Sequence, residues 1–337
     1  MKRILSVFIF IVSLIGCQAL PVAFHGKRGR HLRDAVAATC RVRTPVRDMY
    51  EWETRCMADA RGMVYMPFDG MEECVIPVWP DNMLLAEVVP SEWWRFDNRF
   101  KSAACDTLSL DLVNILPVSA EVVSYKSVYP PAELGRMKWT NGVWSCGFLA
   151  VDGVETNGWM PPLDFRGDVA RTVFYMLTVY PSVSLDPWAF LLVDGSSWPG
   201  LTPYAIELLL RWSQEDPVDD YEIRRNAQIS DSQGGCGNPF VRWAGLEEYI
   251  WGAKAGDVWV DPDADDDERM PLRSVYHLSD ARIDLWSPLV SDGAQWSVDG
   301  SRAVGHVVPA QIGVGCHEFS YVDPQGDRGR VIITVLQ

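Results

Sequence analysis

The chain has 337 residues, of which 48% are hydrophobic and 22% are charged. This composition excludes a disordered chain, and the length is sufficient for a large domain and a smaller one. The formal net charge of −15 excludes an overall positive surface, so contact with a polyanion requires a local basic patch. Fifteen tryptophans indicate either a thick aromatic core, which we favour, or exposed rings that stack on a ligand.

The first 17 residues have the pattern of an export signal. Lys2 and Arg3 precede an apolar run over residues 4–15, which is too short for an ordinary transmembrane helix but typical of a signal peptide. Residues 14–17 (LIGC) resemble the lipoprotein cleavage box, in which the cysteine is lipidated. We therefore expect an exported protein anchored to a membrane through Cys17, facing the periplasm or the cell surface. Plain secretion is the alternative.

Export would place the remaining seven cysteines in a compartment where disulfides persist. Because seven is odd, at least one thiol stays free or pairs with another chain, and the sequence leaves the connectivity open. These cysteines are Cys40, Cys56, Cys74, Cys105, Cys146, Cys236 and Cys316.

Apolar periodicity and turn signals predict a large α+β domain over residues 31–254, after a tether at 18–30 with a basic end. One helix is expected at 31–40, and another is expected after Thr44, because Thr-Pro is typical of an N-cap with proline at the first helical position. Strands are expected between 63 and 77 and over 108–118, the second leading into a short helix. A loop rich in glycine and proline is expected next, followed by helices at 166–180, 203–212, 218–230 and 246–251.

The remainder divides into an acidic linker at 255–272 and a small β-domain at 273–337. Seven acids lie between Asp257 and Glu268 and favour a solvated linker. Calcium binding through Asp261, Asp263 and Asp265 is the alternative, because alternating carboxylates can surround a hard cation. In the β-domain, short alternating strands are separated by turn signals. Its closing stretches, 313–321 and 330–335, resemble the last strands of an immunoglobulin-like sandwich.

Several sequence blocks in a fixed order support a second resemblance, over about 32–251. They are Glu73–Pro77, Asp111–Pro117, Arg166–Arg171 with 174–176, Trp212 with 215–217, Glu222, Arg225–Asn226, Gln233–Gly234 and Asn238–Phe240. In this order they resemble the bacterial Endonuclease I family, which are secreted, nonspecific nucleases of DNA and RNA. The resemblance implies a ββα-metal (His-Me finger) nuclease-like domain with many helices, followed here by the all-β immunoglobulin-like module.

The family's general base is a histidine directly after a glutamate, and here this dipeptide reads Glu73-Cys74. The chain has no histidine between Leu32 and Tyr276. By resemblance, Glu73 would be the metal ligand and Cys74 would occupy the base position. An exported thiol is readily oxidised and is a poor substitute for an imidazole that titrates near neutrality. A positioned base contributes about 10²–10⁴ in rate, so the substitution predicts a loss of that size.

The residue at the second metal-binding position also differs from the family pattern. The family holds Mg²⁺ or Ca²⁺ through the glutamate and an asparagine, and here Val123 stands in the place of the asparagine. Because Mg²⁺ can retain several waters, Glu73 alone is a weak site. Compensation by Glu72, Asp111 and Asn114 is one alternative, and the absence of a bound metal is the other.

Cationic residues that could hold phosphates in this domain include Lys126, the phosphate contact implied by the resemblance, and Lys138. Arg166 and Arg171 could hold phosphates as well, but they flank a helix start, and pairing with acids is the alternative for them. A nucleophilic role for Cys74 is disfavoured, because no histidine of the large domain is available to activate the thiol. A disulfide or a buried position is expected for it. His277, His306 and His317 are expected at the surface or in loops of the β-domain, with a weak metal site as the alternative.

Two functional hypotheses follow from these departures. The first is metal-dependent endonucleolytic hydrolysis of DNA or RNA, impaired at the base and metal positions. The second is a catalytically inactive protein of the cell surface that uses the nuclease scaffold for binding or adhesion.

Overall fold

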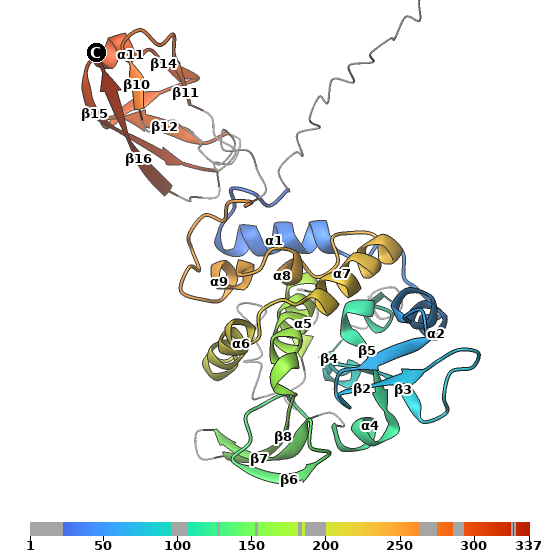
Figure 1. Ribbon diagram of the computed structural model, residues 1–337. Helices are drawn as coiled ribbons and strands as arrows, with labels where there is room; N and C mark the ends of the chain where they lie inside the picture. Colours follow the sequence, from blue (N-terminus) through green and yellow to red (C-terminus); the bar gives the residue numbers. More distant parts are fainter. Residues whose placement is uncertain are drawn as a thin grey trace, which may run out of the picture. The chain divides into compact units, whose positions relative to one another are not determined.

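The computed structural model describes residues 23–95, 107–126, 129–151, 154–180, 184–185, 200–262, 275–285, 293–324, 326 and 328–337. They form two compact units, one over Gly26–Trp259 and the other comprising the residues up to His25 together with Val260–Gln337 (Figure 1). The expected signal peptide, the lipidation site Cys17, and Cys105, Asp263 and Asp265 lie outside the described residues. Among the residues described, no helix has the length and apolar character needed to cross a membrane.

The larger unit is built around α5 (Arg166–Val179), whose residues are buried on almost every side. Helices α1 (Gly29–Cys40), α6 (Pro203–Glu215) and α8 (Pro239–Arg242) pack against it. Other helices in the described part of this unit include α2 (Met49–Trp52), α4 (Ala120–Lys126), α7 (Asp220–Gln233) and α9 (Leu246–Ile250), with short turns η1 (Glu53–Met57), η2 (Ser91–Trp93), η3 (Leu112–Asn114) and η4 (Leu163–Phe165). The preference for a tryptophan core is confirmed by five rings that are fully buried: Trp52, Trp93, Trp144, Trp159 and Trp212.

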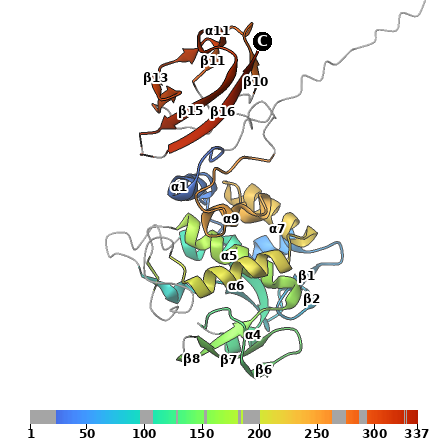
Figure 2. The ribbon, with the colours of Figure 1, turned by 90° about the vertical axis from the view of Figure 1, so that its left-hand side faces the viewer.

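Small antiparallel sheets complete this unit. Strand β1 (Met63–Met66) pairs with β2 (Met71–Cys74), and β3 (Met83–Glu87) pairs with β5 (Ile115–Ser119). The two-residue strands β4 (Trp94–Arg95) and β9 (Ser184–Leu185) pair with each other. A three-stranded sheet contains β6 (Arg136–Thr140), β7 (Ser145–Val151) and β8 (Val154–Met160). This sheet and α1 lie at opposite ends of α5 (Figure 1 and Figure 2).

Two expectations about this unit are wrong. The segment expected as a loop rich in glycine and proline forms the β6-β7-β8 sheet, because its glycines allow close backbone approach: a Cβ on Gly147 would collide with the Arg136 carbonyl oxygen. The second helix does not begin after Thr44, whose backbone N–H is bonded to the Gln233 carbonyl. The helix begins instead at Met49, after Asp48, whose side chain accepts the Glu51 N–H as an N-cap.

The smaller unit is a β-domain with a five-stranded sheet and a two-stranded sheet. The first has the order β10-β16-β15-β12-β13, and the second is β11-β14. Side chains of both sheets share one core, which includes Ile283, Trp296 and Phe319. The elements are β10 (Val275–His277), β11 (Ile283–Asp284), β12 (Gln295–Val298), β13 (Ser301–Ala303), β14 (His306–Val307), α11 (Pro309–Ile312), β15 (Gly315–Val322) and β16 (Arg328–Leu336).

Two features of this β-domain bear on the sequence expectations. One of the turn signals expected between the strands, Asp299-Gly300, does form a turn, with positive φ at both residues (48° and 79°), which a two-residue hairpin of type I′ requires. The expectation that His317 lies at the surface or in a loop is wrong, because it is a buried residue of β15. Its side chain is buried, with Nδ1 2.7 Å from an Asp299 carboxylate oxygen and Nε2 3.0 Å from the Gly313 carbonyl oxygen.

Candidate functional site

The β1-β2 hairpin carries Glu73 and Cys74. Glu73 lies opposite Val64, which is buried in a small apolar cluster, whereas Cys74 lies opposite Met63. Because side chains alternate along a strand, the two neighbouring side chains point to opposite faces of the hairpin. Glu73 is half-buried, and the Cys74 thiol is exposed and hydrogen-bonded to the Ile76 carbonyl at 3.2 Å. The expectation of a disulfide or a buried position for Cys74 is therefore wrong.

The turn of this hairpin is tied to the start of α4. The Asp69 carboxylate accepts hydrogen bonds from the backbone N–H of Ser119, at 2.9 Å, and from its hydroxyl, at 2.7 Å. Ser119 is the last residue of β5, and its hydroxyl oxygen in turn accepts the Val122 N–H at 3.3 Å. These bonds fix the β1-β2 hairpin to the strand and helix that carry Val123.

The residues around Val123 do not fit a tightly held divalent cation. Val123 is 39% exposed on α4 and offers no ligand oxygen. Of the three residues considered as compensation, Glu72 is paired with Arg61, while Asp111 and Asn114 are fully buried with other partners. In the described part of the chain, no group of three or more His, Cys or acidic side chains is arranged to hold a metal ion.

The two buried compensation candidates serve the core. The Asp111 carboxylate accepts the hydroxyls of Tyr175 and Tyr180, at 2.8 and 2.7 Å, and burial raises its pKa to about 6. The Asn114 amide bonds both the N–H and the carbonyl of Val89. Both side chains therefore link the block that begins at Asp111 to neighbouring elements, and their oxygens accept hydrogen bonds within the protein.

Lys126 at the end of α4 is buried, and its ammonium group points inward. Its Nζ donates to the carbonyl oxygens of Glu87 and Val88, at 2.8 and 3.2 Å, and lies 4.9 Å from the centre of the Trp159 ring. Burial lowers the pKa of Lys126 to about 8. This position connects α4 to β3 and does not present the charge to a ligand at the surface.

Arg171 and Arg166 pair with acids, as the sequence suggested. Arg171 on α5 is 1% exposed and donates to Glu222 on α7 at 2.8 Å and to the Asp216 carbonyl at 2.9 Å. Arg166 lies 3.9 Å from Glu215. Asn238 donates to the Arg171 carbonyl at 3.1 Å, so the block that begins at Asn238 is fixed to the same network. Several of the quoted blocks thus meet at α5, in a network that orients helices.

Comparison with known proteins supports the resemblance to Endonuclease I for part of the chain. Residues 86–244 match the family model for Endonuclease I. The chain is also 29% identical over 143 residues to an extracellular ribonuclease of Bacillus subtilis (strain 168), and 28% identical over 161 residues to an extracellular ribonuclease of Bacillus amyloliquefaciens. This chain carries an Endonuclease I domain.

The similarity to the two ribonucleases is partial on both sides. The aligned regions cover 42% and 47% of this chain and 46% and 52% of the relatives. The chain thus spans about half the length of the curated relatives it matches. The Endonuclease I match itself includes Val123, Lys126 and Arg171 but begins after Glu73 and Cys74. The assignment of these two residues to the metal and base positions therefore stays a prediction.

No pattern in the sequence predicts the bond between Asp69 and Ser119, which joins the Glu73 hairpin to α4. An Asp-Gly pair after an apolar strand reads as an ordinary turn, and its partner lies 50 residues away. An aspartate at this position predicts a turn. It does not predict that the carboxylate accepts hydrogen bonds from Ser119, at the end of β5.

Proposed function

We propose that this chain is an exported protein that binds nucleic acid through its Endonuclease I domain and hydrolyses it weakly. The observation that carries the proposal is the pair Cys74 and Val123, at the positions where the resemblance expects a general base and a metal-binding amide. Binding is supported by the Endonuclease I match and by relatives named as ribonucleases. Weak hydrolysis is supported by the thiol and by the lack of a ligand oxygen at Val123.

The expected loss of rate follows from the roles of the two positions. Hydrolysis of a phosphodiester requires a base that removes a proton from the attacking water, and a positioned base contributes about 10²–10⁴ in rate. A divalent ion in this family would neutralise charge on the phosphate and the leaving oxygen. Glu73 remains available as one carboxylate ligand, so restoring the other two groups is a direct test.

The test is degradation of plasmid DNA and of RNA in Mg²⁺, Ca²⁺ or EDTA by wild type and by Cys74→His/Val123→Asn. We expect the double variant to cleave about 10² times faster than wild type or more. EDTA, or Glu73→Ala added to the double variant, should abolish the gain. Cys316→His is the matched control, because it places a histidine at another exposed thiol and should leave the rate unchanged.

Fast cleavage by wild type that both EDTA and Glu73→Ala abolish would refute weak hydrolysis. It would mean that Glu73 and a base other than a histidine are sufficient. No gain in the double variant, with nucleic acid still bound, would refute the assignment of Cys74 and Val123 to the catalytic positions.

Export is part of the proposal, and it rests on the N-terminal sequence and on the extracellular relatives. Lipidation at Cys17, with anchoring to a membrane, is the finer proposal. The mass of the mature chain distinguishes a lipid-modified N-terminal cysteine from plain secretion.

We also propose that the smaller unit is immunoglobulin-like. The neighbouring strands β12, β15 and β16 correspond to the C-F-G order of such a sandwich, and the β11-β14 pair corresponds to B and E. This module favours a second candidate function, in which the protein mediates adhesion at the cell surface. Nucleic-acid binding should weaken steeply with salt, whereas adhesion through an apolar surface should respond little.

A further inference from the structure

Basic residues are concentrated near the start of the larger unit. Residues 27–47 contain seven of the chain's 30 lysines and arginines but only one of its 45 acids, Asp34. This segment includes α1 and the connection to α2. It is therefore a strongly positive segment in a chain whose net charge is −15.

Three of these cations lie on the segment between α1 and α2, which we call the arginine loop (residues 41–47). Arg41, Arg43 and Arg47 are exposed, and none has an ion pair among the described residues. Elsewhere, exposed arginines such as Arg61 and Arg211 do pair with carboxylates. The loop itself contains no acid, so its charges are not neutralised locally.

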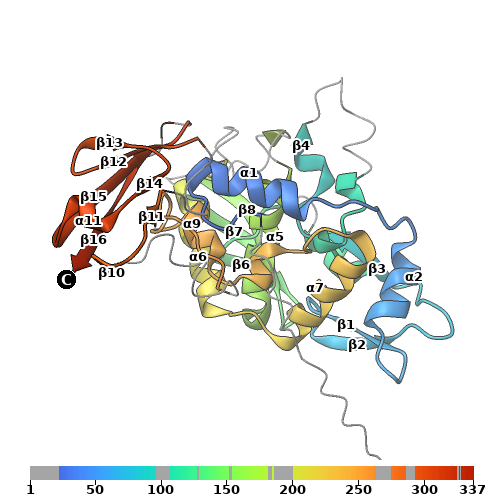
Figure 3. The same ribbon diagram turned by 90° about the horizontal axis from the view of Figure 1, so that it is seen from above.

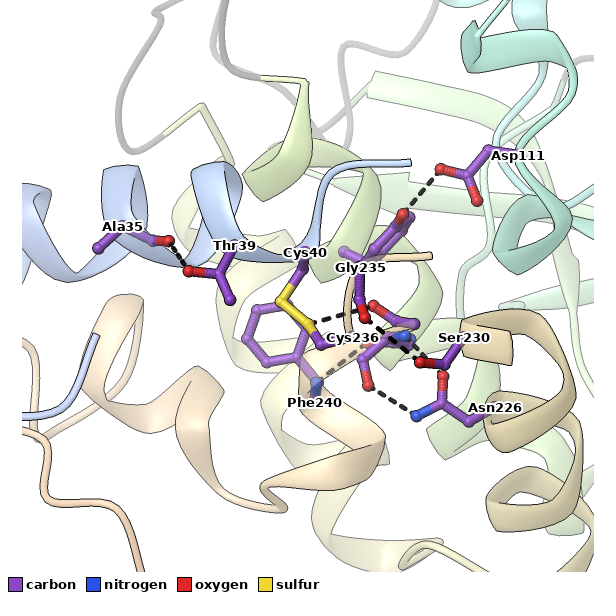
Figure 4. The surroundings of a disulfide bond; sticks show 12 residues. Ala35, Thr39, Cys40, Asp111, Asn226, Ser230, Gly235, Cys236 and Phe240 are labelled. Carbon is purple, nitrogen blue, oxygen red and sulfur yellow. Dashed lines mark hydrogen bonds between the residues drawn. A yellow bond between two sulfur atoms is a disulfide. The ribbon is translucent and has the colours of Figure 1, made fainter. Parts of the chain in front are cut away.

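The arginine loop is held in place at its start. Cys40, directly before Arg41, forms a disulfide with Cys236, which joins the end of α1 to the loop that follows α7 (Figure 4). The backbone N–H groups of Arg43 and Thr44 both donate to the Gln233 carbonyl, at 3.0 Å. The loop thus presents its arginines from a fixed backbone, which reduces the entropy lost when a ligand binds.

Two glycines allow this close approach. A Cβ on Gly235 would lie 3.0 Å from the carbonyl oxygens of both Cys40 and Arg41. A Cβ on Gly234 would lie 3.3 Å from the Arg43 side chain. The positive φ angles of both glycines, 71° and 77°, also favour glycine. The sequence after α7 is therefore fitted to the backbone of the arginine loop.

Stabilisation of helix ends explains only part of this arrangement. Cations near the last turns of α1 and α7 interact favourably with the helix dipoles, but the effect falls off within a turn. Arg47 lies seven residues beyond the end of α1, so this explanation does not extend to it. Three unpaired like charges on one short loop repel each other, and an anionic ligand would relieve that repulsion.

The loop leads from α1 to the elements of the candidate site. It passes the C-terminal end of α7, where it contacts Gln233, and enters α2 (Figure 3). On α2, the Trp52 Nε1 donates to Ser232 of α7 at 2.8 Å, and the Tyr50 ring lies 5.1 Å from the Trp79 ring. Trp79 follows Glu73 and Cys74 by a few residues. Helix α2 therefore joins the arginine loop to the segment that follows β2.

We propose that Arg41, Arg43 and Arg47 form a phosphate-binding ridge that holds the backbone of a nucleic acid. This inference rests on the proposed function for the class of ligand. The guanidinium group matches phosphate geometry with two parallel N–H donors, which suits a polyanion with regularly spaced phosphates. The ridge supplies the local basic patch that an acidic chain requires for such a partner.

The test compares Arg41→Gln/Arg43→Gln/Arg47→Gln with wild type. Binding to a short fluorescein-labelled single-stranded DNA, and to the same sequence as RNA, is followed by anisotropy in EDTA at several salt concentrations. We expect about tenfold weaker binding or more at low salt. The slope of log K against log salt should fall by about 2, because each phosphate contact to a single strand contributes about 0.7.

Two further variants control the experiment. Arg282→Gln/Arg302→Gln/Arg330→Gln removes the same charge from exposed sites of the smaller unit and should leave the affinity within about twofold of wild type. Arg41→Lys/Arg43→Lys/Arg47→Lys keeps the charge and should retain most of the salt slope. Circular dichroism and the mass of the Cys40–Cys236 disulfide peptide check that each variant is folded.

Equal affinity and equal salt slope in the glutamine variant and wild type would overturn the ridge while leaving the proposed function in place. An equal loss in the control triple variant would also overturn the ridge, because only net charge would matter. Binding to phosphatidylglycerol vesicles but not to nucleic acid would assign the loop to a membrane surface and reject the proposal. Arginine-dependent binding with no cleavage by any variant would uphold the ridge and refute the hydrolytic part of the proposed function.

Discussion

His317 shows how a single side chain couples the β-domain to pH. Its Nδ1 lies 2.7 Å from Asp299 and its Nε2 lies 3.0 Å from the Gly313 carbonyl, so both ring nitrogens face acceptors. Only the protonated imidazolium can donate from both nitrogens. The hydrogen bond to Asp299 therefore raises the pKa of His317 above its ordinary value of 6.5, although burial opposes this. The same bond lowers the pKa of Asp299.

The sign of the pH dependence follows from these directions. Because the pKa of His317 is higher in the folded state, its stabilisation is complete below pH 6.5 and is lost as pH rises through the folded pKa. Asp299 contributes above its ordinary pKa of 3.8, and this contribution is lost as pH falls through its lowered pKa. We expect the Tm of the β-domain, measured by calorimetry on the full chain, to decrease from pH 6 to pH 8.5 in wild type but not in His317→Gln.

His306→Gln is the control for this prediction, because His306 is exposed on β14. That variant should keep the wild-type dependence on pH. If His317→Gln followed the same pH curve as wild type, the imidazolium would not be the group responsible.

The amino-acid sequence predicts several local features of the chain, but it does not predict the pairing of His317 with Asp299. Asp299-Gly300 is a recognisable hairpin turn, and its positive φ angles are what the dipeptide favours. The pairing of Asp299 with His317 is not visible, because it depends on the register of β12 against β15. The same limit applies to Cys74. Its place in a strand was predicted, but its exposure was not, since alternation leaves open which face is covered.

At the scale of elements, the network at Arg171 determines how α5 and α7 pack. Arg171 contacts Glu222 and Asp168, and all three side chains are buried. Arg171→Met would leave two carboxyl groups buried without a partner, which costs about 3–5 kcal/mol. We expect urea denaturation to show a loss of that size in the free energy of unfolding.

The matched control is Arg211→Met. Arg211 is half-exposed and pairs with Glu133 at 3.0 Å on the surface, where such a pair contributes about 1 kcal/mol or less. Equal losses of unfolding free energy in the two variants would contradict this prediction, because the carboxyl groups of Asp168 and Glu222 would then have to be in contact with water. A double variant Arg171→Met/Glu222→Met should recover part of the stability, because it removes one uncompensated carboxylate.

Elements with strong periodicity were predicted well from sequence. The helices at 166–180 and 203–212 correspond to α5 and α6, where apolar residues recur at helical spacing and Thr202 caps α6. The β6-β7-β8 sheet was missed because polar and glycine residues interrupt its alternation. One stabilising partner is Phe68, whose ring packs against Trp159 of β8 and also against Phe165, although Phe68 lies far from the sheet in sequence.

At the scale of the whole chain, the Cys40–Cys236 disulfide closes a loop with a sequence separation of 196 residues. Such a long cross-link restricts the unfolded chain, and its loss costs about 2–5 kcal/mol. We expect dithiothreitol, or Cys40→Ser/Cys236→Ser, to lower the denaturant midpoint of the Gly26–Trp259 unit while the β-domain unfolds as before. Cys316→Ser serves as the control, because this exposed thiol has no disulfide.

The same variant connects stability to the arginine ridge. Cys40 precedes Arg41 directly, so loss of the disulfide should loosen the arginine loop even where the unit remains folded. Under conditions in which Cys40→Ser/Cys236→Ser is fully folded, we expect weaker binding to single-stranded DNA than in wild type, with a salt slope that changes little because the charges remain. Unchanged affinity in the folded variant would show that the hydrogen bonds to Gln233 are sufficient to hold the loop. A lower slope would instead mean that phosphate contacts are lost when the loop is released.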